Sequence, residues 1–216
     1  MTLPLPLRNR LTELILGAFH DEDARRGLEA VTAVCDDPRA LEAAGRVPES
    51  FPADLFERSR DGLAVKSGLR AHQPAFCERA RQAWRLVCGQ PLEPRDPPLG
   101  RALYTAACLF DAGLYFEMHE QLEPYWMRAE GAEREIVQGL IQVAVGFQHL
   151  ANGNLDGARL LLHDGCARLL GRSLGGMDLE VFAQGVRRCW EEAVALGARD
   201  AGGFDWAAVP RFPRRD

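Results

Sequence analysis

The residues best suited to metal binding or catalysis in this sequence are His119, Glu120 and Glu123. They place one imidazole and two carboxylates within five positions. On a helix, His119 and Glu123 are one turn apart, so their side chains meet. Imidazole and carboxylate groups are ligands of divalent metal ions, and the same groups transfer protons in general acid/base catalysis. These three residues are therefore our candidate metal ligands.

Aromatic residues surround this group. At about 100° per residue, Tyr115 and Trp126 fall on the His119 side of a helix. A face with such neighbours is expected to be partly buried, and a buried carboxylate there must be paired. Pro124 interrupts the segment because it removes the amide hydrogen that would bond the carbonyl of Glu120. The helix is thus expected either to kink at Pro124 or to end near Glu123.

A second polar stripe occurs in the next predicted helix. Glu135, Gln138, Gln142 and His149 lie within about 60° of one another on a helical wheel, inside an otherwise apolar run. Buried amides need hydrogen-bond partners. The two stripes are therefore predicted to face each other and form one polar island, made of His119, Glu120, Glu123, Gln138, Gln142 and His149.

Three interpretations of this island stay open. It binds a divalent metal ion, it binds a small polar ligand with acid/base chemistry, or it is a structural network that fixes helix register. The segment differs from the zincin pattern His-Glu-x-x-His because position 123 is Glu. Any reaction would be metal-assisted hydrolysis or general acid/base catalysis, and no catalytic nucleophile is indicated.

Helical patterns dominate the chain and predict an all-α fold. Helices are predicted over residues 7–19, 21–34, 37–44, 52–70 and 74–88, then over 99–112, 114–126, 133–151, 155–170 and 179–196. Four prolines between Gln90 and Pro98 cannot lie inside a helix and mark a boundary.

These elements predict an N-terminal helical extension at 1–98, a core helical bundle at 99–198 and a C-terminal tail at 199–216. The bundle would consist of two helical hairpins plus a C-terminal helix, and the end of the tail, 211–216, is expected to be loose. Glycines inside helices are interpreted as close helix contacts at Gly139, Gly146 and Gly157. The glycine-rich turn 171–176 follows no strand, so it is not expected to bind phosphate.

Composition limits the classes of binding partner and the cellular compartment that we expect for this chain. The 26 basic and 31 acidic residues give a net charge of −5, so nucleic acid is not an expected partner. The apolar segment from Ile136 to Ala151 is too short and too polar to span a membrane. The N-terminus lacks the order of a signal peptide, and the six scattered cysteines are expected to be reduced thiols. Together these features predict a cytoplasmic protein.

The central segment resembles the family called domain of unknown function 309. Its hallmark, a His followed by Glu and then Trp, stands here as His119-x-x-x-Glu123-x-x-Trp126. The resemblance covers residues 103–170. It implies a small helical protein of bacteria or archaea whose motif has been supposed to bind metal and whose family has no established activity. The further ligand-binding or network candidates are Glu117, Trp126, Gln138, Gln142 and His149.

The resulting functional hypothesis is an inter-helix site for a divalent metal ion or a small polar ligand. The alternative is a non-catalytic scaffold in which the polar residues only stabilise the fold. In that case the helical hairpins would present a surface to a protein partner or to a second copy of the chain.

Overall fold

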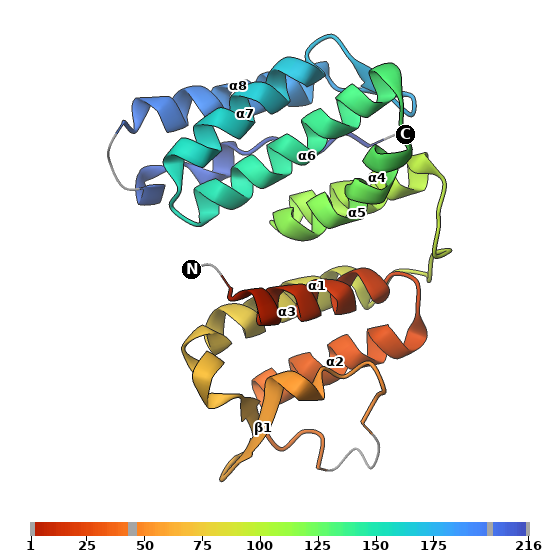
Figure 1. The fold of residues 1–216 in the computed structure, drawn as a ribbon, viewed down its shortest axis with the longest axis vertical. Helices are drawn as coiled ribbons and strands as arrows, with labels where there is room; N and C mark the ends of the chain where they lie inside the picture. The colour runs from red at the N-terminus through yellow and green to blue at the C-terminus, as the bar shows by residue number, and fades with distance from the viewer. Residues whose placement is uncertain (1–2, 43–46, 198–200, 215–216) are drawn as a thin grey trace. The chain divides into compact units, whose positions relative to one another are not determined.

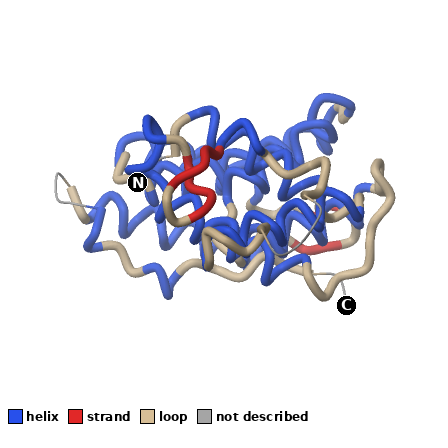
Figure 2. Tube along the Cα trace, turned by 90° about the horizontal axis from the view of Figure 1, so that it is seen from below, coloured by secondary structure: helices blue, strands red, loops and turns tan. Residues whose placement is uncertain are grey.

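A computed structural model describes residues 3–42, 47–197 and 201–214. The predicted all-α fold is confirmed: within these residues lie eight α-helices, short 3₁₀ turns and two short antiparallel strand pairs (Figures 1 and 2). The chain divides into two compact units, Met1–Pro97 and Pro98–Asp216. No helix in the described residues is both long and apolar enough to cross a membrane.

Three helices that pack on one another build the N-terminal unit: α1 (Leu5–Gly17), α2 (Glu22–Asp36) and α3 (Gln73–Val87). The side chain of Asp21 caps α2 by accepting hydrogen bonds from the amides of Asp23 and Ala24. The proline-rich segment is bound to this unit, because the Glu93 amide donates to the carbonyl of Phe19 at 2.7 Å.

The helix predicted over 52–70 is wrong. This segment forms the turn η1 (Ala53–Leu55), the hairpin of β1 (Phe56–Ser59) and β2 (Gly62–Val65), and the turn η2 (Ser67–His72). Gly62 has φ +121°, and a Cβ there would lie 2.3 Å from the Pro38 carbonyl oxygen, so a side chain and a helix are both excluded. The short helix predicted over 37–44 is also wrong for its described part, because residues 38–42 form turns; 43 and 44 lie outside the described residues.

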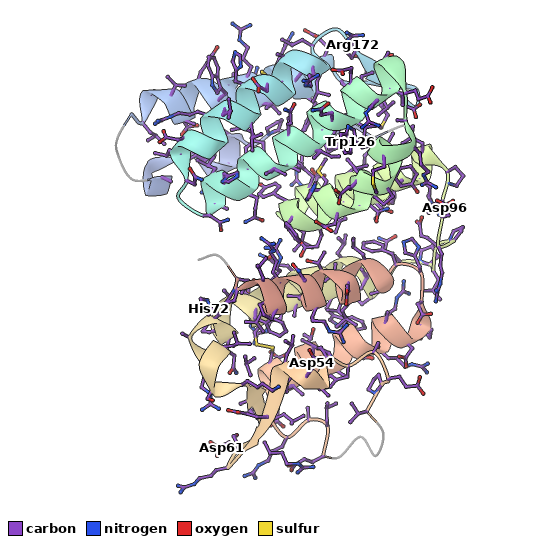
Figure 3. All side chains as sticks on the ribbon, viewed as in Figure 1. Asp54, Asp61, His72, Asp96, Trp126 and Arg172 are labelled. Atoms are coloured by element: carbon purple, nitrogen blue, oxygen red, sulfur yellow. A yellow bond between two sulfur atoms is a disulfide. The ribbon has the colours of Figure 1, made fainter. Side chains whose placement is uncertain are left out.

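The expectation of six reduced thiols is wrong as well. Cys35 of α2 and Cys77 of α3 form a disulfide, visible as a yellow bond in Figure 3. The four other cysteines are not in disulfides: Cys88 is exposed, and Cys108, Cys166 and Cys189 are buried. The pairing was missed because 42 positions separate the two residues, and only the packing of α2 on α3 brings them together.

The C-terminal unit contains α4 (Leu99–Asp111), α5 (Tyr115–Arg128), α6 (Gly131–Ala151), α7 (Leu155–Leu169) and α8 (Glu180–Ala195). Each helix packs on the next one in the chain (Figure 1). A small hairpin of β3 (Ser173–Leu174) and β4 (Met177–Asp178) joins α7 to α8, and the short turns η3 (Ala201–Gly203) and η4 (Trp206–Ala208) follow α8. Asn154 caps α7 as its type predicts, since its side chain accepts from the Gly157 amide.

Aromatic rings from α4, α6, α8 and the C-terminal segment pack together in the core of this unit. Phe110 of α4 lies 5.5 Å from Phe147 of α6 and 5.3 Å from Phe182 of α8, between ring centroids. Phe212, near the C-terminus, joins them and is buried. The loose end expected for 211–216 is therefore wrong over its described part: the Phe212 amide donates to Asp111, and Arg214 pairs with the same carboxylate.

Glycines allow α6 and α7 to approach closely, as predicted. A Cβ on Gly165 would lie 2.9 Å from the Gly139 carbonyl oxygen and 2.9 Å from the Val143 amide nitrogen. A Cβ on Gly146 would lie 2.9 Å from Leu162, and one on Gly157 would lie 2.8 Å from His149 Nδ1. Two of the three atoms nearest to a Cβ on Gly165 belong to backbone, so they cannot move aside as a flexible side chain would.

Gly165→Ala is therefore expected to lower the free energy of unfolding by about 1–3 kcal/mol, the usual cost of overpacking. The matched control is Gly100→Ala in α4, where a Cβ would meet nothing within 4 Å. The control should be neutral or slightly stabilising. Denaturant unfolding of both variants measures the difference, and equal stabilities would contradict the close contact.

Thiol titration checks the cysteine assignment. With an aromatic disulfide reagent, the native protein should react quickly at exposed Cys88 alone. Denaturation without reductant should expose the four free thiols, and reduction should raise the number to six. Six reactive thiols in the denatured, unreduced protein would rule out the Cys35–Cys77 bond.

Candidate functional site

Helix α5 brings His119, Glu120 and Glu123 together on one side. One ligand atom from each residue lies within 4.8 Å of the other two, and all three residues are partly buried. The spacing explains this arrangement, because positions i, i+1 and i+4 of a helix span about 100° of its circumference. The structure thus groups the three predicted ligands into one cluster, which we call the α5 cluster.

The imidazole of His119 has an unusual environment. Its Nδ1 lies 3.3 Å from Glu120 Oε1, a distance that would count as an ion pair if the ring were protonated. The directions of the two groups do not make a hydrogen bond, and Nδ1 is buried without a hydrogen-bond partner in the described residues. The side chains of His119 and Glu120 keep 24% and 35% of their exposure. A buried polar atom without a partner costs about 1–3 kcal/mol, so it needs a physical explanation such as a bound ion or water.

Pro124 does not end the helix. Helix α5 continues to Arg128, so the prediction of an end near Glu123 is wrong. Proline has no amide hydrogen, and the carbonyl of Glu120 therefore receives none from position 124. This leaves a backbone oxygen without its usual helical donor at a residue of the α5 cluster.

Trp126, labelled in Figure 3, follows the cluster by one turn. Its indole nitrogen is also buried without a hydrogen-bond partner in the described residues. Arg134 of α6 covers the ring, with Cζ 4.3 Å from the ring centroid, and its Nη1 donates to the Trp126 carbonyl at 3.0 Å. Arg134 was not among the predicted residues, although a cation one short loop away from a tryptophan is a common stacking partner.

The predicted polar island is wrong for Gln142 and His149, and the membership of Gln138 stays a prediction. Gln142 of α6 accepts a hydrogen bond from Arg168 Nε of α7 at 3.0 Å, and Arg168 also pairs with Glu135. His149 Nδ1 lies 2.9 Å from Asn154 Nδ2, at the start of α7. These three residues of the α6 stripe thus bond toward α7 instead of joining the α5 cluster.

Two candidates remain, Gln138 and Glu117. Gln138 of α6 is partly buried. Glu117 is buried on α5. It stands two residues before His119, so it points to the other side of the helix.

The glycines explain the direction of the α6 stripe. On a helical wheel, Gly139 and Gly146 fall within about 60° of Gln142. The glycine face is the face that α7 covers, so the polar residues beside the glycines must face α7 too. This signal was present in the sequence and would have assigned the stripe correctly.

Residues 103–161, from α4 into α7, match the family described as Domain of unknown function (DUF309). This segment is therefore similar to that family over 103–161 of the 216 residues. The predicted resemblance is thus confirmed for a segment that includes the whole α5 cluster and Trp126. No curated protein and no solved structure matches the chain.

Tyr115 begins α5 in the DUF309 segment and anchors that helix to the aromatic core. Its ring stacks on Phe147 at 5.4 Å and on Trp206 at 6.5 Å between centroids. Burial, with smaller contributions from Cys189 and Asp111, raises the pKa of Tyr115 to about 12 from 10.0. Burial likewise raises the pKa of Cys189 to about 12.

Alkaline pH should therefore destabilise this unit. The unfolded chain releases the Tyr115 proton near pH 10, whereas the folded protein keeps it to about pH 12. The unfolded state then binds fewer protons, so the free energy of unfolding falls as pH rises through this window. In the Tyr115→Phe variant the free energy of unfolding should fall less steeply with pH, and the part due to Cys189 should remain. Denaturant unfolding at pH 9, 10 and 11 measures this dependence. The same dependence on pH in the variant and in the unmodified protein would contradict a raised pKa of Tyr115.

Proposed function

We propose that the α5 cluster binds a divalent metal ion through His119, Glu120 and Glu123. The observation that carries this proposal is the convergence of one ligand atom from each residue within 4.8 Å. The buried, unpartnered His119 Nδ1 supports it. A cation beside His119 Nδ1 and Glu120 Oε1 would give the buried nitrogen the partner that it lacks in the described residues.

The donor set indicates the class of metal. One imidazole nitrogen and two carboxylate oxygens suit ions that accept both donor types, such as Zn²⁺, Mn²⁺, Fe²⁺ or Ni²⁺. An all-oxygen preference, as for Mg²⁺ or Ca²⁺, fits less well because the imidazole would then be a poor ligand. Three protein ligands leave coordination positions for water or a substrate, and metal-assisted hydrolysis is the reaction class that such a site supports.

Metal binding is tested on the purified full chain after treatment with a chelator. Titration calorimetry with Zn²⁺ and with Mn²⁺ should show one site per chain. His119→Ala should weaken binding by about tenfold or more, and Glu123→Gln should also weaken it, since each removes one of three ligands. A bound ion should also raise the melting temperature of the unmodified protein, because it binds only the folded state.

His163→Ala is the matched control. His163 and Asp164 of α7 form the same sequence pair of a histidine and an adjacent acid, with Nδ1 3.0 Å from Oδ1, but both side chains are more exposed, at 56% and 44%. No third ligand completes that pair within the described residues. The control should bind metal like the unmodified protein, and equal loss in both histidine variants would argue against the α5 cluster.

The scaffold alternative predicts a different result. If the cluster is only a structural network, His119→Ala and Glu123→Gln should lower the melting temperature, and no added metal should change the melting of the unmodified protein. A cytoplasmic location, a protein partner and self-association stay predictions. The Cys35–Cys77 disulfide removes the argument for the location that was based on reduced thiols.

A further inference from the structure

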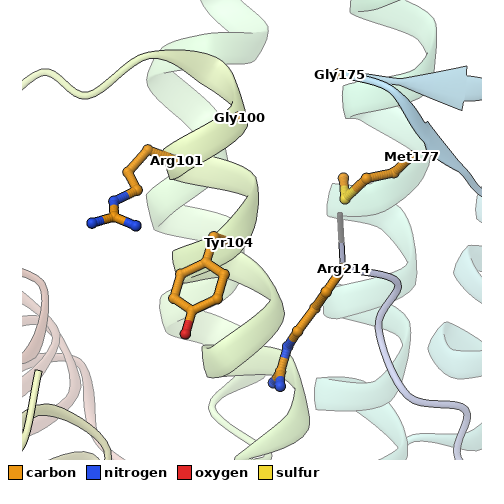
Figure 4. Close-up of a pocket in the computed structure, with 6 residues that line it drawn as sticks. All are labelled: Gly100, Arg101, Tyr104, Gly175, Met177 and Arg214. Carbon is orange, nitrogen blue, oxygen red and sulfur yellow. The ribbon is translucent and has the colours of Figure 1, made fainter. Parts of the chain in front are cut away.

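A hollow that the proposed metal site does not use lies between the start of α4 and the β3–β4 hairpin (Figure 4). Its volume is about 220 Å³. It is lined by Gly100, Arg101, Tyr104, Gly175, Met177 and Arg214. All of these residues belong to the C-terminal unit, and none belongs to the α5 cluster.

The walls combine an aromatic ring with two cations. The Tyr104 ring lies between two guanidinium groups: Cζ of Arg101 is 5.8 Å from the ring centroid and Cζ of Arg214 is 6.0 Å from it. Figure 4 shows the Arg214 side chain extending toward Tyr104, whereas that of Arg101 points away from Arg214. Met177 supplies an apolar wall opposite α4.

The charge around this hollow is opposite to that of the whole chain. The chain has a net charge of −5, but the described lining contains two arginines and no acid. Arg214 Nη2 pairs with Asp111 at 2.8 Å. A guanidinium has five N–H donors, so this pair leaves others for a ligand. Asp111 also lies 3.7 Å from Arg211, so two arginines share this one carboxylate.

Backbone groups add to the positive character. Helix α4 has no side-chain cap at its start. The first amide hydrogens of a helix have no acceptor within the helix and point out of its N-terminal end. Gly100 and Gly175 carry no side chains, which leaves the peptide backbone of both walls accessible. A Cβ on Gly100 would meet nothing within 4 Å, so the space beside it is open.

We infer that this hollow binds a small anion that carries a planar, apolar body, such as an aryl carboxylate or an aryl phosphate. Arg214 binds the anionic group through a charge-assisted hydrogen bond. The Tyr104 ring and the Met177 side chain cover the apolar body. The volume is below the 300–1,000 Å³ or so typical of sites for drug-sized molecules, which limits the body to about one ring.

This proposal is independent of the proposed metal site, and its test uses metal-free full-length protein. Phenyl phosphate and benzoate are titrated into ¹⁵N-labelled protein and followed by amide chemical shifts. The Gly100 and Gly175 amides should shift on titration, and those of Gly139 and Gly165 in the α6–α7 contact should not. Benzamide, which has the ring without the charge, and inorganic phosphate, which has the charge without the ring, should each bind about tenfold more weakly or worse.

Variants locate the site. Arg214→Gln should raise the dissociation constant for phenyl phosphate about tenfold or more, and Tyr104→Ala should raise it severalfold. Arg211→Gln is the matched control, because Arg211 approaches the same Asp111 but does not line the hollow, and it should leave binding unchanged. Tyr104 is an exposed residue, so its variant still tests the hollow if loss of the Arg214 pair disturbs the C-terminal segment.

Three results would overturn the inference. They are the absence of shifts at Gly100 and Gly175, equal binding of benzamide and phenyl phosphate, and equal loss of binding in the Arg211 and Arg214 variants. His119→Ala should bind phenyl phosphate normally, so failure of the metal proposal and failure of this one give different results.

Discussion

The close backbone contact between α6 and α7 is the constraint on which the C-terminal unit depends. A Cβ on Gly165 would lie 2.9 Å from backbone atoms of Gly139 and Val143, and one on Gly139 would lie 2.9 Å from Arg168 Cβ, so neither position accepts a side chain without a shift of the neighbouring atoms. This contact fixes the rotation of α6 about its own axis. Arg168 then reaches Gln142 and Glu135 across the contact, and a second side of α6 is left for the aromatic ring of Phe147, which contacts α5.

Helix α5 is positioned by that second side. Tyr115 stacks on Phe147 of α6, and Arg134 of α6 covers Trp126 near the other end of the helix. Between these anchors, His119, Glu120 and Glu123 lie at the edge of the packed face, partly buried and close together. Rigid packing at both ends gives the three side chains a shared position, which a metal site requires, because ligands held in place lose little entropy on binding.

The C-terminal segment contributes to the core instead of extending from it. Phe212 enters the aromatic cluster, and Asp111 holds the segment through the Phe212 amide and Arg214. The same interaction brings Arg214 beside Tyr104 and so forms one wall of the hollow at the start of α4. One carboxylate near the end of α4 therefore links the closure of the fold to the inferred anion site.

Features that depend on neighbours along the chain could be predicted from the residues alone. Most of the predicted helices, the capping role of Asn154 and the i, i+1, i+4 spacing of the α5 cluster are local properties, so these predictions agree with the structure. Features that depend on residues far apart in the chain became clear only from the three-dimensional structure. They are the Cys35–Cys77 bond, the hairpin at 56–65 beside Pro38, the burial of Phe212 and the direction of the α6 stripe. A helical wheel gives the angles between side chains, but it does not tell which neighbouring helix covers each face. Steric contact determines which face of α6 packs on α7, because the α7 backbone approaches α6 at its glycines.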